Sequence, residues 1–305
     1  MTAPAGQHVP VLAAPIAALA SGAARVVDAT LGDGGHAAHF RAAGSEVLGI
    51  DRDPEAIARA RGRLGESGIR YLNVPYASPA ALEAVREFRP GFILLDLGVS
   101  SRQLDDPALG FTFRPGAPLD MRMDRAGATA ADLLNQLPER ELEQVLREWG
   151  DEPRARAMAA EVVRRRARAS FATSDDLVNA IRAVLGARSG PPDFARIFQA
   201  VRIAVNHELD GLARALPAFR DALVPGGRLA VISYHSGEDR LVKHTFRDWA
   251  RSCVCPPVQP VCTCRGRALG RLETRKALEP GPDEVAANPR ARSARLRVFQ
   301  VADAP

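Results

Sequence analysis

The sequence predicts an α/β fold in which a mostly parallel sheet is interrupted by an inserted helical domain. Between residues 25 and 97, short apolar runs alternate with helical stretches, a pattern typical of a parallel sheet. The alternation stops near residue 105 and resumes after residue 193. We therefore expect a discontinuous core of residues 1–104 and 194–305, and a helical domain of residues 105–193.

The first part of the core reads as a Rossmann-like unit of alternating strands and helices. The predicted strands are Arg25 to Ala29, Glu46 to Asp51, Ile69 to Val74 and Phe92 to Leu97, with helices near Gly35 to Ala43, Pro54 to Leu64 and Pro79 to Phe88 between them. Right-handed crossovers place the carboxyl ends of all these strands at one rim of the sheet, where open α/β sheets bind ligands. The residues at or just beyond this rim are Asp28, Asp51, Tyr76 and Asp96.

The inserted domain is expected to be helical throughout. One helix follows Pro138 and ends at Gly150, and another is capped by Thr173 or Ser174 and ends near Gly186. Between them lies an apolar stripe at helical spacing, formed by Ala155, Met158, Ala159, Val162 and Val163. The arginines on the other faces, which are Arg154, Arg164, Arg165 and Arg168, form either an ordinary solvated face or a surface for RNA.

The second part of the core completes the sheet. A long helix is expected from about Phe194 to Leu223, followed by a strand from Arg228 to Ser233 and a helix from Glu238 to Ala250. A cysteine-containing loop comes next, and the chain is expected to return as an edge strand at Arg297 to Phe299.

The composition indicates a basic protein without a membrane span. The formal net charge is +5, and all basic residues except Lys243 and Lys276 are arginines. Arginine binds phosphates well, so a polyanionic partner is plausible, although a biased composition would give the same balance. No run of about 18 apolar residues is present, and the Ala-rich stretch near Pro15 lacks a basic leader. We expect a soluble cytoplasmic protein with no membrane partner.

All four cysteines lie close together in the sequence. They form two Cys-x-Cys pairs, Cys253 with Cys255 and Cys262 with Cys264. Four thiolates could hold one tetrahedral zinc ion, but this spacing is less diagnostic than Cys-x-x-Cys. A metal site and a loop of reduced thiols both remain open.

A glycine-rich turn, Gly32-Asp33-Gly34-Gly35-His36, follows the first strand and predicts a cofactor site. Nineteen residues after Gly32, the second strand delivers Asp51, whose carboxylate could accept both hydroxyls of a ribose. The turn also satisfies the fingerprint of NAD-binding folds. Asp28, just before the turn, would repel a pyrophosphate but suits a cationic sulfonium ligand, which favours S-adenosylmethionine.

Several motifs together resemble one family. These motifs are Gly34-Gly35-His36, Ile50-Asp51-Arg52-Asp53-Pro54, Leu94-Leu95-Asp96-Leu97-Gly98-Val99-Ser100-Ser101, Pro118-Leu119-Asp120-Met121-Arg122-Met123-Asp124, Ser233-Tyr234-His235-Ser236 and Asn288-Pro289-Arg290-Ala291-Arg292-Ser293. Through them the chain resembles, from His8 to Val298, the ribosomal RNA small-subunit methyltransferase H family, also called MraW.

The resemblance implies transfer of a methyl group from S-adenosylmethionine to the N4 amine of a cytidine in the decoding region of 16S rRNA. Matching motifs imply that the cofactor contacts are Gly34, Gly35, His36, Asp51, Tyr76, Asp96 and Gln103. The rim geometry indicates four of these independently, whereas His36, Tyr76 and Gln103 rest mainly on the resemblance. The implied partner is 16S rRNA or the small ribosomal subunit, and a monomer and a homodimer both remain open.

Two other function classes are weighed against this one. They are an NAD-dependent oxidoreductase and a non-catalytic rRNA-binding assembly factor. For the methyltransferase, cytosine N4 is a poor nucleophile, so a hydrogen-bond acceptor is needed near the rim. Asp96 is the expected acceptor, and His235 at the end of the last rim strand is either a competing base or a residue that orients its loop.

Overall fold

The computed structural model describes residues 10–256, 259 and 261–303, so His8 lies outside the described residues. The chain divides into two compact units, one of residues 1–98 and 210–305 and one of residues 99–209. The expected division was after residues 104 and 193. The observed division places the segments 99–104 and 194–209 with the helical unit.

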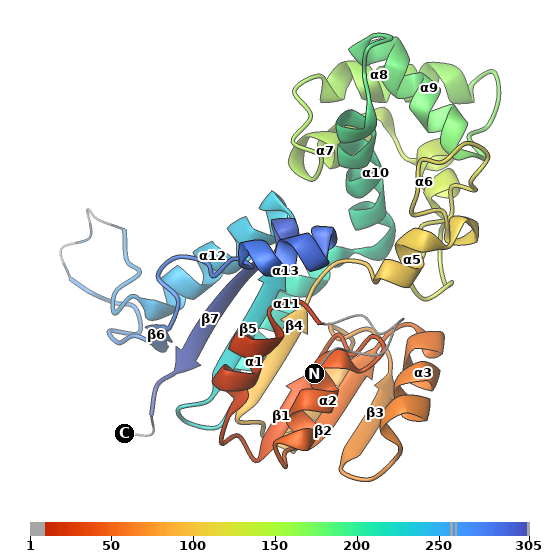
Figure 1. Ribbon diagram of the computed structural model, residues 1–305. Helices are drawn as coiled ribbons and strands as arrows, with labels where there is room; N and C mark the ends of the chain where they lie inside the picture. The colour runs from red at the N-terminus through yellow and green to blue at the C-terminus, as the bar shows by residue number, and fades with distance from the viewer. Residues whose placement is uncertain (1–9, 257–258, 260, 304–305) are drawn as a thin grey trace. The chain divides into compact units, whose positions relative to one another are not determined.

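The first unit is built on one seven-stranded sheet in the order β3-β2-β1-β4-β5-β7-β6 (Figure 1). Strands β1 to β5 are parallel, and β7 and β6 are antiparallel additions. The strands are β1 Arg25–Asp28, β2 Glu46–Asp51, β3 Ile69–Asn73, β4 Phe92–Asp96, β5 Arg228–Ser233, β6 Gly270–Leu272 and β7 Arg295–Val301. The expected parallel strands are therefore present, each within one residue of its predicted end.

The prediction of an edge strand at Arg297 to Phe299 is wrong in one respect. These residues do belong to a strand, β7, but β7 lies between β5 and the short strand β6, which forms the edge. Sequence reasoning missed β6 because three residues are too few to show a strand periodicity.

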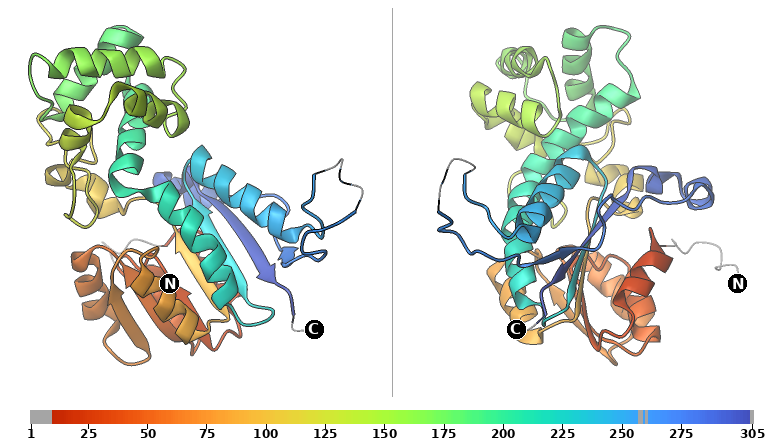
Figure 2. Two further views of the ribbon diagram at one scale, coloured as in Figure 1. Left: turned by 180° about the vertical axis from the view of Figure 1, so that it is seen from behind. Right: turned by 90° about the vertical axis from the view of Figure 1, so that its left-hand side faces the viewer.

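Helices cover both faces of the sheet (Figures 1 and 2). One face packs against α1 Ala13–Ala20, α2 Gly35–Ala42 and α3 Pro54–Leu64, and the other against α4 Pro79–Phe88, α11 Glu208–Ala222 and α12 Ser236–Ala250. The side chains of β1 alternate between the two cores, since Val26 packs with the first set and Val27 with the second. The C-terminal part adds α13 Pro282–Ala287 and the 3₁₀ helix η2 Pro289–Ser293.

Local sequence explains where two of these helices begin. The Asp53 side chain accepts a hydrogen bond of 2.8 Å from the backbone N–H of Glu55, and Pro54 occupies the first helical position of α3. In α4, Ser78 caps the helix and Pro79 starts it. A capping acceptor followed by proline is a strong helix start, because it satisfies one exposed N–H and removes another.

The second unit is helical, as predicted, with its own apolar core. Its elements are α5 Ser101–Asp105, η1 Pro107–Leu109, α6 Ala130–Gln136, α7 Glu139–Glu148, α8 Ala155–Arg166, α9 Ser174–Leu185 and α10 Pro191–Asn206. The predicted stripe on α8 is buried at Ala155, Met158, Ala159 and Val162, whereas Val163 is only half-buried. In the part of the chain that the structure describes, no helix combines the length and apolarity that a membrane crossing needs.

The prediction of one long helix from Phe194 to Leu223 is wrong. Two helices, α10 and α11, are separated at His207, whose φ of 51° is left-handed. The preceding Asn206 is buried, and its amide donates to the carbonyl of Met121 at 2.7 Å while its oxygen accepts from the N–H of Met123 at 2.9 Å. These hydrogen bonds join residues that are more than 80 positions apart in the sequence, so helical periodicity could not reveal the break.

Candidate functional site

Three acidic residues end three neighbouring strands of the sheet. Asp51 is the last residue of β2, Asp28 of β1 and Asp96 of β4, and these strands are adjacent in the order β2-β1-β4. Because the strands are parallel, all three carboxylates lie at the same rim. This is the rim at which open α/β sheets bind nucleotides and related ligands.

Asp51 is held in place by the backbone of two turns. One carboxylate oxygen accepts a hydrogen bond of 2.8 Å from the N–H of Gly32, and the other accepts one of 2.8 Å from the N–H of Asp53. A carboxylate oxygen can accept more than one hydrogen bond. The pair of oxygens is therefore fixed in position and can still accept the two hydroxyls of a ribose.

The glycine-rich turn has room for a ligand at one position and none at another. Gly32 has a φ of 52°, and a Cβ built there would meet no atom of the described residues within 4 Å. Gly34 caps α2 with a φ of 76°, and a Cβ there would lie 2.7 Å from Leu64. Gly34 is thus required by backbone conformation and packing, whereas the space beside Gly32 is open, as a close approach by a ligand requires.

Asp96 belongs to a polar cluster at the rim. The hydroxyl of Tyr234 donates a hydrogen bond of 2.9 Å to Asp96 Oδ1, and Nε2 of His36 lies 3.7 Å from Asp96 Oδ2. Burial raises the pKa of Tyr234 well above its usual value, so this hydroxyl keeps its proton and acts as a donor. Tyr234 belongs to one of the motifs found in the sequence, but no role was predicted for it. Its place directly after β5 was the available signal.

The cluster contains buried polar groups that point to a ligand. His36 is only 6% exposed, and neither ring nitrogen has a hydrogen-bond partner among the described residues. Asp28 is 1% exposed, and within the described part of the chain its carboxylate receives only a long bond of 3.4 Å from the N–H of Thr30. Buried polar groups left in this state are costly. A positively charged ligand with its own hydrogen-bonding groups fits these residues, whereas a negatively charged pyrophosphate does not.

The Asp28 carboxylate should make the stability of the protein depend on pH. Burial raises its pKa from the ordinary 3.8 to about 6; the charge of His36 opposes this rise, and that of Asp96 adds to it. The folded state therefore retains a proton that the unfolded state releases, and stability falls as the pH rises from about 4 to about 6. The free energy of unfolding falls by about 3 kcal/mol over this pH range, and it stays lower at higher pH.

Asp28→Asn should remove this loss. At pH 7.5 we expect the variant to have a free energy of unfolding up to about 3 kcal/mol above that of the original chain, and near pH 4 the two should converge. Denaturant unfolding of both proteins across this range measures the difference. A difference that does not change with pH would contradict the assignment.

The other predicted cofactor residues lie in two different units. Tyr76 follows β3, is half-buried, and packs its ring 6.5 Å from that of Phe219 on α11, so it has a packing role whether or not it contacts a ligand. Gln103 belongs to the helical unit, where it completes a capping box with Ser100 at the start of α5. Its Oε1 accepts the Ser100 N–H at 2.9 Å.

His235 caps α12. Its Nδ1 accepts a bond of 3.4 Å from the N–H of Glu238, and its Nε2 lies 3.2 Å from Oε1 of the same glutamate, which is 2% exposed. The other oxygen of Glu238 accepts the N–H of Tyr234 at 3.0 Å. This geometry favours the second interpretation of His235, a residue that orients the loop carrying Tyr234.

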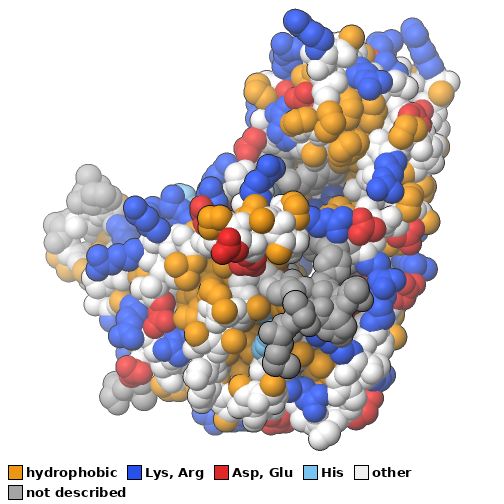
Figure 3. All heavy atoms as spheres, in the orientation of Figure 1, with side chains coloured by type: hydrophobic (Ala, Val, Ile, Leu, Met, Phe, Trp, Pro, Cys, Tyr) orange, Lys and Arg blue, Asp and Glu red, His pale blue; other side chains and the backbone are white. Residues whose placement is uncertain are grey.

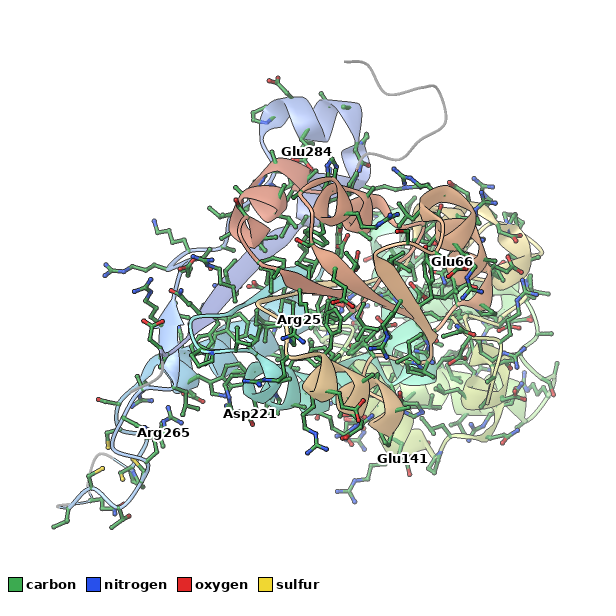
Figure 4. The ribbon with its side chains drawn as sticks, turned by 90° about the horizontal axis from the view of Figure 1, so that it is seen from below. Arg25, Glu66, Glu141, Asp221, Arg265 and Glu284 are labelled. Carbon is green, nitrogen blue, oxygen red and sulfur yellow. The ribbon has the colours of Figure 1, made fainter. Side chains whose placement is uncertain are left out.

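Several arginines of β7 and α8 have acidic partners. Arg297 donates two bonds, of 2.7 and 3.0 Å, to Asp239, and Arg295 lies 3.5 Å from the same carboxylate. Glu284, near the same end of the chain, accepts the N–H of Leu12 at 2.7 Å (Figure 4). On α8, both Arg164 and Arg165 contact Glu161. In Figure 3, basic side chains are spread over the visible face rather than gathered in one patch.

The sheet order, the antiparallel β7 and the acidic rim define the class of the protein. They form a Rossmann-like sheet with an inserted helical unit, which is the fold predicted for a methyltransferase. The chain matches the model of the MraW methylase family over residues 5–302, and it belongs to that family. Membership in a methylase family decides against the NAD-dependent oxidoreductase.

Related proteins cover almost the whole chain. It is 59% identical to a ribosomal RNA small subunit methyltransferase H of Gemmatimonas aurantiaca, over 99% of this chain and 98% of that one. It is 48% identical to the protein of the same name from Rubrobacter xylanophilus, over 98% and 97% of the two chains. Among solved structures, an rRNA methylase from Streptococcus thermophilus is 10% identical, with a TM-score of 0.42 and coverage of 95% and 94%.

Proposed function

We propose that this protein transfers a methyl group from S-adenosylmethionine to the N4 amine of a cytidine in the decoding region of 16S rRNA. The family and the names of the relatives support an rRNA methyltransferase. The observation that carries the donor part of the proposal is the acidic rim, where Asp51 is held for a ribose while Asp28, His36 and Asp96 form a buried polar cluster. The N4 amine and the decoding region are what the sequence resemblance implies.

The rim residues have separate tasks in this proposal. S-adenosylmethionine supplies an electrophilic methyl group on a positively charged sulfur. Asp51 accepts the ribose hydroxyls, the open side of Gly32 lets the ligand approach the backbone, and the negative charge of Asp28 attracts a cationic donor. Further cofactor contacts are assigned to Gly34, Gly35, His36, Tyr76, Asp96 and Gln103.

Asp96 is the proposed contact for the target amine. The nitrogen lone pair of cytosine N4 is delocalised into the ring, so an acceptor that binds the N–H hydrogens raises its nucleophilicity and orients it. Tyr234 holds one oxygen of Asp96 at 2.9 Å, which fixes the direction of the carboxylate. Orientation supplies most of the rate effect, and the proton leaves after the methyl group has moved. His235 acts as a positioning residue through Glu238.

The RNA must present an accessible cytosine. A cytosine in a duplex uses N4 in base pairing, so the target must be single-stranded, looped or flipped out. Arg168, Arg290 and Arg292 are exposed and are assigned to phosphate contacts. The substrate is 16S rRNA or the small subunit, and the proposed location is therefore the cytoplasm.

Nucleoside mass spectrometry tests this function directly. Labelled donor is offered to 16S rRNA and to intact small subunits from cells that lack this activity, and the product nucleosides are identified. We expect N4-methylcytidine with the original chain. Methylation at another cytidine atom would contradict the N4 assignment. RNA binding without any methyl incorporation would favour the non-catalytic assembly factor.

A further inference from the structure

The four cysteines converge in space although they lie in an exposed loop. This loop connects α12 to β6, and we call residues 253–264 the cysteine loop. The described Sγ···Sγ distances are 3.5 Å for Cys262 and Cys264, 3.7 Å for Cys262 and Cys253, 3.8 Å for Cys264 and Cys253, and 4.0 Å for Cys255 and Cys262. All four sulfur atoms lie within 4.8 Å of one another. Figure 4 shows them gathered near Arg265.

These distances match the geometry of one metal ion. Zinc binds thiolates tetrahedrally at about 2.3 Å, so the edges of the sulfur tetrahedron are about 3.8 Å long. A disulfide bond is about 2.05 Å long, and all four cysteines are free. We propose that Cys253, Cys255, Cys262 and Cys264 bind one zinc ion in a closed tetrathiolate site.

Hydrophobic burial does not explain the convergence. Cys253 and Cys262 are exposed and the other two cysteines are half-buried, whereas free cysteines usually pack in apolar interiors. The neighbouring valines point outward, since Val254 is 40% exposed and Val261 is 69% exposed. The described part of the loop therefore lacks an apolar core, and a metal ion can replace such a core in a small segment.

The surrounding backbone is arranged for a thiolate. The N–H of Val254 donates to the sulfur of Cys264 at 3.3 Å. Donors of this kind around metal-bound sulfur orient the ligand and stabilise its charge.

The base of the loop is closed independently of the cysteines. The N–H of Leu269 donates to the carbonyl of Trp249 at 2.8 Å, and the guanidinium of Arg265 donates to the carbonyls of Arg251, Arg267 and Asp248. A zinc ion would therefore order the outer part of a loop that is already anchored to the sheet unit. With four protein ligands it would have no open position, so its role is structural.

Metal analysis of the full-length protein tests the proposal. We expect about one zinc per chain by elemental analysis after purification under reducing conditions. Replacement of zinc by cobalt should give the visible absorption bands of a tetrahedral cobalt tetrathiolate. The chain has four cysteines in total, so any thiolate-to-cobalt signal must come from this cluster. Less than about 0.1 zinc per chain, both as purified and after anaerobic reconstitution with zinc, would overturn the site. Bound iron in place of zinc would overturn the choice of metal.

Paired variants separate the metal from the loop sequence. Cys255→Ser combined with Cys262→Ser should lose the zinc, whereas Thr263→Ala, in the same loop, should retain it. Chelation should increase the rate of tryptic cleavage after Arg265 on the order of tenfold in the original chain, because the loop loses the metal ion that orders it. The double variant should be cleaved equally fast with and without chelator, and far-UV circular dichroism checks that it is folded. Unchanged zinc content in the double variant would contradict the ligand assignment.

Discussion

Asp51→Ala should abolish useful binding of S-adenosylmethionine while leaving the protein folded. The two hydrogen bonds proposed from the ribose to this carboxylate are charge-assisted, and each contributes about 1.5–3 kcal/mol. Losing both should raise the dissociation constant at least about a hundredfold. Isothermal titration calorimetry with the donor measures this change. Circular dichroism and the unfolding midpoint check the fold.

Asp53→Ala is the matched control for Asp51. Asp53 lies two residues away at the same rim, but its side chain caps α3 by accepting the N–H of Glu55. This variant should lose about 1 kcal/mol of stability, as helix caps do, and should bind the donor within about threefold of the original affinity. Normal donor binding by Asp51→Ala would show that the rim assignment is wrong. An equal loss in both variants would point to a general effect of charge.

Asp96→Asn should reduce methyl transfer by about 10²- to 10⁴-fold, the range for a group that handles a proton or orients a nucleophile. The amide keeps the size of the side chain and can still accept the Tyr234 hydroxyl, but it loses the negative charge that holds the amine hydrogens. Single-turnover methylation with saturating donor and rRNA isolates this step from binding. Donor affinity should fall by about tenfold or less, because Asp51 remains in place.

Two further variants show whether the effect belongs to this carboxylate. Tyr234→Phe removes the hydrogen bond to Asp96 Oδ1, so it should slow transfer by about tenfold through loss of orientation. Asp33→Asn changes an exposed acid in the glycine turn that pairs with Arg59 at 2.7 Å, and it should have near-normal activity. A turnover rate for Asp96→Asn within about threefold of the original would remove Asp96 from the mechanism.

Much of the site was predictable from the sequence because it depends on local pattern. Alternating apolar runs indicated the parallel strands, and each rim acid follows directly from where its strand ends, as Asp28, Asp51 and Asp96 show. The glycine turn next to Asp51 was visible for the same reason. What these patterns could not show was which oxygen each backbone N–H would contact.

The remaining features depend on residues that are distant in the chain. Asp96 and Tyr234 are 138 positions apart, and only the pairing of β4 with β5 brings them together. The break at His207 depends on the contact of Asn206 with a segment more than 80 residues earlier. In the cysteine loop, spacing left both a zinc site and free thiols open, and the three-dimensional path of the chain brought the sulfur atoms together.

The sequence by itself determined the class of fold, the rim of the sheet proposed to hold the site and the acids at that rim. Only the tertiary structure decided the partners of those acids, the division of the long helix and the shape of the cysteine cluster. The physical reason is that strand and helix periodicity are properties of neighbouring residues. Hydrogen bonds between side chains on different strands form only after the sheet has assembled.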